Sequence, residues 1–134
     1  MSVWKTVIVA AGIALAVPSC GGGGSSSDTG GCTTPTGGVT GTAATGTATT
    51  VKVVSDPTTV GKFDPQTVTV KAGDSVTWDF QDQGTSHTVT ADNASFDSCL
   101  QAASFKFTVT FPTAGDFPYK CTVHAAMTGD VKVS

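Results

Sequence analysis

From residue 50 to the C-terminus, apolar and polar residues alternate with the two-residue period of β-strands. These segments are rich in β-branched and aromatic residues, and turn signals such as Asp56-Pro57 and Ala72-Gly73 separate them. We expect strands over residues 50–54, 67–71, 75–80, 87–90, 104–111, 117–121 and 130–133, with room for a helical turn only within 92–103. About seven or eight short strands without a clear helix predict an all-β, Greek-key β-sandwich.

The composition favours one small folded domain and excludes a nucleic-acid partner. Only 13% of the 134 residues are charged, with seven lysines, ten acidic residues and no arginine. Such a chain has no basic patch for a polyanion and cannot form bidentate arginine–phosphate contacts. We expect residues 49–134 to form a single monomeric domain of about 85 residues, a size sufficient for a small sandwich.

The first 19 residues predict an export signal of the lipoprotein type. Lys5 supplies a positive charge, residues 6–17 form an apolar run, and small residues precede Cys20. The apolar run is too short to cross about 30 Å of hydrocarbon comfortably. Val17-Pro-Ser-Cys20 resembles a bacterial lipobox, so Cys20 is the predicted lipidation site. We expect an exported protein anchored by lipid at a periplasmic or other extracytoplasmic membrane surface, with ordinary secretion or an uncleaved N-terminal anchor as alternatives.

Residues 20–48 predict a disordered tether between this anchor and the domain. The segment consists almost entirely of Gly, Ser, Thr and Ala and contains no aromatic residue. It cannot bury enough apolar surface to offset the entropy lost on ordering. A flexible tether of this kind would give the domain a wide reach from the membrane.

A cluster of soft donor residues lies near the C-terminus. The heptapeptide Cys121-Thr-Val-His124-Ala-Ala-Met127 places a thiol, an imidazole and a thioether three positions apart, and His87 is the other histidine of the chain. Two His and one Cys with a weak axial Met form the blue-copper electron-transfer pattern. Zinc is the nearest alternative because Cys and His bind it well, but a thioether is not a usual zinc ligand.

In this order and spacing, the donor residues and the strands around them resemble the cupredoxins, in particular the plastocyanin, amicyanin and pseudoazurin group. The resemblance covers roughly residues 49–134 and implies one type 1 copper bound by His87, Cys121, His124 and Met127. Thr88 stands where the family often has Asn, and its hydroxyl can still form a local hydrogen bond. Main-chain N–H groups near His87 are expected to donate to the Cys121 sulfur and to tune the reduction potential.

The resemblance implies a single-copper electron carrier rather than an enzyme. One electron would pass between two redox proteins, a donor and an acceptor. A copper chaperone or store is the alternative, but it would use an open site rich in Met or His, and this chain has two of each. A metal-free, immunoglobulin-like surface lipoprotein is a further alternative.

The family also implies a surface through which electrons enter and leave. In its members, the His of the ligand loop reaches an apolar patch where partners dock. The corresponding residues are His124 and its uncharged neighbours Val123, Ala125 and Ala126.

The remaining cysteines predict a disulfide. With Cys20 assigned to the lipid and Cys121 to copper, Cys32 and Cys99 are left, and an exported protein tends to pair such cysteines. Two unpaired thiols remain the alternative.

Overall fold

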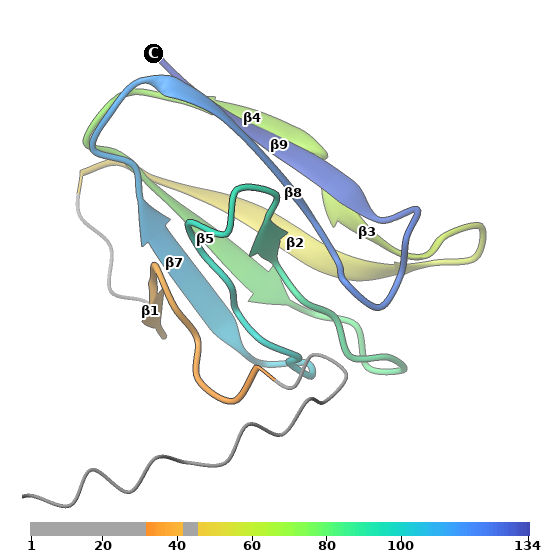
Figure 1. The fold of residues 1–134 in the computed structure, drawn as a ribbon. Helices are drawn as coiled ribbons and strands as arrows, with labels where there is room; N and C mark the ends of the chain where they lie inside the picture. Colours follow the sequence, from red (N-terminus) through yellow and green to blue (C-terminus); the bar gives the residue numbers. More distant parts are fainter. Residues whose placement is uncertain (1–31, 42–45) are drawn as a thin grey trace, which may run out of the picture.

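The computed structural model describes residues 32–41 and 46–134. The predicted signal segment 1–19, the lipidation residue Cys20 and residues 20–31 of the predicted tether lie outside the described residues. The described part of the chain forms nine strands in two packed sheets, without a helix (Figure 1). No helix that could span a membrane therefore occurs within it. The predicted all-β sandwich is confirmed.

The two sheets are both mixed, with one parallel strand pair in each. The five-stranded sheet has the order β1 (Val39–Thr40), β7 (Lys106–Thr110), β5 (Ser75–Phe80), β2 (Ala48–Asp56) and β3 (Val60–Asp64). The four-stranded sheet has the order β4 (Thr67–Val70), β9 (Thr128–Val133), β8 (Gly115–Lys120) and β6 (Thr90–Ala91). The parallel pairs are β2 with β5 and β4 with β9, and all other pairs are antiparallel.

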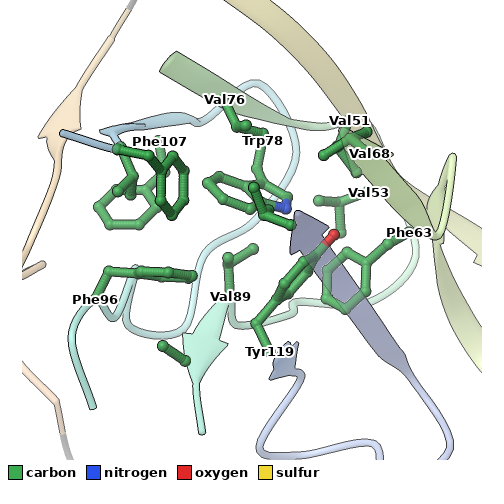
Figure 2. Packing of buried hydrophobic residues seen from close by; sticks show 14 of the residues in the cluster. Val51, Val53, Phe63, Val68, Val76, Trp78, Val89, Phe96, Phe107 and Tyr119 are labelled. Carbon is green, nitrogen blue, oxygen red and sulfur yellow. The ribbon is translucent and has the colours of Figure 1, made fainter. Parts of the chain in front are cut away.

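The core lies between the sheets and is built around aromatic residues (Figure 2). Trp78 of β5 and Tyr119 of β8 are almost fully buried, and their rings meet edge to face with centroids 5.1 Å apart. Phe63 of β3 packs against the other side of Tyr119 at 4.7 Å. These contacts join the sheets close to the end of β8, where Cys121 follows, so the position of Cys121 depends on the packing of the core.

Two segments differ from the sequence-based expectation. Strand β3 was not predicted because two Asp-Pro turn signals leave only a short, glycine-containing segment between them, yet it pairs with β2 along its whole length. The stretch 92–103 contains no helix. Instead, it forms loops that hydrogen bond to neighbouring segments, as in Ser98 N to Val89 O at 2.9 Å.

Part of the segment predicted to be a tether is ordered in the structure. Within 20–48, the described residues 32–41 lie against the sandwich: β1 pairs with β7, and Thr36 exchanges two main-chain hydrogen bonds of 2.8 and 2.9 Å with Asp97. Strand β2 already begins at Ala48. Composition failed to predict this because main-chain hydrogen bonds and a disulfide order a segment whose one large apolar side chain, Val39, is half exposed.

Candidate metal centre

His87 is held by the framework of the sandwich. It follows the loop that leaves β5, and its main chain exchanges hydrogen bonds of 3.0 and 2.9 Å with Gln101. The residue is 1% exposed. Gly61 of β3 lies so close to the imidazole that a Cβ at this position would overlap ring atoms. A glycine is therefore required where the hairpin of β2 and β3 passes the ring.

Cys121 and Met127 begin and end the predicted ligand loop. Cys121 directly follows β8, and its N–H donates to the carbonyl of Met127 at 2.9 Å, while the Met127 N–H donates to the carbonyl of His124 at 2.9 Å. These bonds close a tight loop of seven residues. Both end residues are 1% exposed, whereas His124 is half-buried.

In the structure, the donor atoms of three of the four predicted ligands lie close together. The Nδ1 atoms of His87 and His124 lie 3.1 Å apart, and the Cys121 Sγ lies 4.0 Å from the first and 3.5 Å from the second. Metal ions bind His nitrogen at about 2.0–2.1 Å and Cys sulfur at about 2.3 Å, so three such donors around one ion stand roughly 3.5–3.8 Å apart. The observed distances bracket this range, and the donor set fits one metal ion. Met127, the fourth predicted ligand, is buried in the core cluster, and its main chain hydrogen bonds to Cys121 and His124.

Thr88 connects the two segments that carry these ligands. Its N–H donates to the Cys121 sulfur at 3.3 Å, as expected for a main-chain donor near His87. Its hydroxyl oxygen accepts the N–H of Thr122 at 2.8 Å. A hydroxyl therefore forms the cross-loop bond for which the family often uses an Asn side chain.

Asp82 belongs to the centre and was missed by sequence reasoning. Its Oδ2 lies 2.7 Å from the His87 Nε2, and its Oδ1 accepts the N–H groups of Gly84 at 2.8 Å and Thr85 at 3.3 Å. The hydrogen bond with His87 lowers the pKa of the Asp82 carboxyl; burial acts in the opposite direction, and the two main-chain donors lower it further. The turn signal Asp82-Gln-Gly84 could have suggested an acceptor, but not that it faces a histidine five residues later.

Cys32 and Cys99, the pair predicted to be bridged, form a disulfide in the structure, with an S–S distance of 1.96 Å and a Cα–Cα distance of 5.1 Å. Cys32, Asp97 and Cys99 also bring potential metal-binding atoms together. Both sulfurs belong to the disulfide, so this second cluster offers no thiolate ligand. Among the described cysteines, Cys121 alone is free, and it is buried.

The predicted docking residues surround His124 at the surface. Val123 is 53% exposed, and Ala125 and Ala126 are also exposed. The structure thus places an uncharged surface directly beside the half-buried imidazole.

A Cys, two His and a buried Met at one end of a mixed β-sandwich define a cupredoxin-type metal centre. The family model of copper binding proteins, plastocyanin/azurin family, matches residues 49–134, and the chain belongs to this family. Copper is therefore its cofactor. The family consists of single-copper electron carriers rather than enzymes.

Relatives agree with this assignment. Chloroplastic plastocyanin from Tetradesmus obliquus is 41% identical over 83 residues, 53% of this chain and 57% of the relative, so the chain spans less than two thirds of that protein. A purple cupredoxin from Nitrosopumilus maritimus has a TM-score of 0.55 at 23% identity, covers 63% of this chain and 98% of its own, and supports the fold alone. A reduced Cu(I) amicyanin variant at pH 4 has a TM-score of 0.52 at 27% identity, with coverages of 63% and 82%.

Proposed function

We propose that this chain is an exported electron carrier in which one copper ion is bound by His87, Cys121, His124 and Met127. The observation that carries this proposal is the convergence of two Nδ1 atoms and one Sγ within 4.8 Å of one another. Cys121 and Met127, the thiol and thioether residues of the ligand loop, are both buried. A compact N₂S donor set with a nearby Met matches the preference of type 1 copper.

The surroundings of the donors suit repeated electron transfer. His87 is held through its main chain and its ring, and Thr88 links the two ligand-bearing segments. A site held in one geometry rearranges little when the metal changes its oxidation state, which keeps the barrier to transfer low.

A copper chaperone or store is less well supported. Such a protein must release its metal readily and therefore needs exposed donors. Here Cys121, Met127 and His87 are each 1% exposed. Of the four predicted ligands, only His124 reaches the surface. One exposed imidazole gives an electron a path to the metal, but it does not give a copper ion a way out of the site.

We propose that redox proteins dock at Val123, His124, Ala125 and Ala126. An uncharged surface with small side chains lets a partner approach the imidazole without desolvating a charge. Such contacts are small and dissociate fast, as a carrier requires.

We also propose that Cys20 carries the lipid and that residues 20–31 form the free part of the tether at an extracytoplasmic membrane surface. The support comes from the sequence alone. Mass spectrometry of the mature N-terminus should find a lipid-modified cysteine. In a detergent phase-partitioning experiment, the protein should be recovered in the detergent phase. A soluble product cleaved elsewhere would contradict the anchor but not the copper site.

The experiment for the electron-carrier function is a paired titration of the purified protein. Copper(II) should bind in a ratio of one per chain, and the loaded protein should take up and release one electron reversibly. Binding of more than one ion in cysteine-independent sites, or copper that leaves on each reduction, would contradict the proposal and favour a handling protein.

A further inference from the structure

Asp82 is a buried carboxylate whose side-chain hydrogen bonds go to His87 of the metal centre and to its own turn. Its side chain is 4% exposed and that of His87 is 1% exposed. One oxygen faces the His87 Nε2 at 2.7 Å, and the other accepts the two N–H groups of the turn. The main chain is anchored as well, because the N–H groups of Gln81 and Asp82 both donate to the carbonyl of Val53 in β2, at 2.8 and 3.1 Å. The carboxylate is therefore fixed in place by the sandwich.

Resting on the electron-carrier function proposed above, we propose that Asp82 is the positioning residue of His87: it orients the imidazole and lowers the reduction potential of the bound copper. An imidazole that carries its proton on Nε2 presents a lone pair at Nδ1. The Nδ1 atom is the one that lies 3.1 Å from His124 Nδ1 and 4.0 Å from the Cys121 sulfur. The hydrogen bond to Asp82 thus selects the tautomer that can bind metal.

The charge of Asp82 accounts for the effect on the potential. With a thiolate and two neutral imidazoles, the centre carries a net charge of about +1 with Cu(II) and about 0 with Cu(I). Adding the buried carboxylate changes these values to about 0 and −1. A net charge is unfavourable in a buried site, so the carboxylate favours the oxidised state.

Other groups around His87 do not duplicate this role. Gly61 meets the ring only through its main chain, and the main chain of His87 pairs with Gln101. Cys121 and His124 are themselves donors toward the metal. Among the ion pairs of the described residues, Asp82 pairs with His87 and with no lysine, so its charge is not neutralised by another side chain.

The test compares Asp82→Asn, Asp82→Glu and Asp92→Asn with the original protein in the copper-loaded form. Asn keeps the size and an acceptor oxygen but removes the charge, and Glu restores the charge. Asp92 lies five residues after His87, as Asp82 lies five before it, but its side chain is 49% exposed and pairs with Lys120. It is therefore a matched control for the loss of one negative charge.

Asp82→Asn should weaken Cu(II) binding relative to Cu(I) about tenfold, which raises the one-electron potential by about 59 mV. Asp82→Glu should return most of this shift, and Asp92→Asn should change the potential far less. The blue absorption should persist in all three variants. A potential of Asp82→Asn that equals that of Asp92→Asn would overturn the proposal, whereas an original protein that binds no copper would overturn the electron-carrier function instead.

A measurement on the original protein decides the question if Asp82→Asn does not fold. In the reduced copper protein, the proton on His87 Nε2 should appear in the NMR spectrum as a strongly downfield resonance that exchanges slowly with water. A fast-exchanging proton without the downfield shift would show that the carboxylate does not hold the ring, and would overturn the assignment of Asp82.

Discussion

The two histidines of the metal centre are held in opposite ways. His87 is 1% exposed, lies against Gly61 and Asp82, and pairs with Gln101 through its main chain. His124 is half-buried on a seven-residue loop whose central residues are exposed. The first ligand is therefore fixed by the sandwich before metal binds, and the second is carried to the surface. We infer that the His87 side sets the geometry and the potential, whereas the His124 side sets the rate of electron exchange.

Removal of the Cys32–Cys99 disulfide should have the largest effect on stability. The bridge spans a sequence separation of 67, and loss of a loop of this length corresponds to about 4 kcal/mol in the chain-entropy model. Ser98 and Gln101, within two residues of Cys99, hydrogen bond to the segment that begins at His87. Loss of the bridge should therefore destabilise the part of the sandwich that holds His87. Urea unfolding of the double Cys→Ser variant measures it.

The control for this prediction is Cys121→Ser in the metal-free protein, which keeps the disulfide and should lose less stability. If both proteins unfold at the same urea concentration, the bridge does not stabilise the framework.

Gly61→Ala should be the next most damaging change. The added Cβ overlaps the His87 ring, and overpacking of a buried position costs about 1–3 kcal/mol. The ring must move, so copper retention against a chelator should also fall. Gly84→Ala is the matched control because an added Cβ there meets only Asp82 Oδ1, at 3.5 Å. Equal copper retention in the two variants would show that His87 does not depend on the β3 contact.

On the loop side, Ala126→Lys should slow electron exchange without changing the site. A charge on the apolar surface must be desolvated when another molecule approaches His124, and a cost of about 1.4 kcal/mol slows the rate about tenfold. Self-exchange between oxidised and reduced copies, followed by NMR line broadening, measures this rate without an identified partner. Thr69→Lys adds the same charge at an exposed position of β4, which pairs with Lys132 near the end of β9 that is remote from the ligand loop, and it should have little effect. An equal rate in both variants would place the electron path elsewhere.

Met127→Leu should have the smallest effect of these changes on copper binding, but a measurable effect on the reduction potential of the bound copper. A thioether is a weak axial donor that favours Cu(II) modestly, so its loss should leave copper bound and raise the potential. A change of up to about tenfold in relative affinity corresponds to about 59 mV. Voltammetry of the variant decides the point, and a lowered potential would contradict the role of Met127.

Much of the sandwich and of the donor set follows from the sequence because both rest on local patterns. Residues 75–80 show their burial through aromatic and β-branched residues, and they form β5 as expected. The spacing of Cys121, His124 and Met127 places all three on one short loop, so their proximity needs no knowledge of the fold.

The parts that could not be predicted depend on contacts between distant segments. Asp82 is an ordinary turn residue until the loop after β5 folds back and brings it to the His87 ring. Gly61 is required only because the ring lies against it. Residues 32–41 carry no apolar pattern, and they are ordered by the pairing of β1 with β7 and by the bridge to Cys99.

The visible spectrum of the Cu(II)-loaded protein tests the central claim most directly. A thiolate bound to Cu(II) gives an intense charge-transfer absorption, and Cys121 is the free cysteine of the described chain. The original protein should be intensely blue, and Cys121→Ser should lose this absorption even when copper is still bound. A Cys121→Ser variant that remains blue, or an original protein that binds copper without colour, would contradict the assignment of this site.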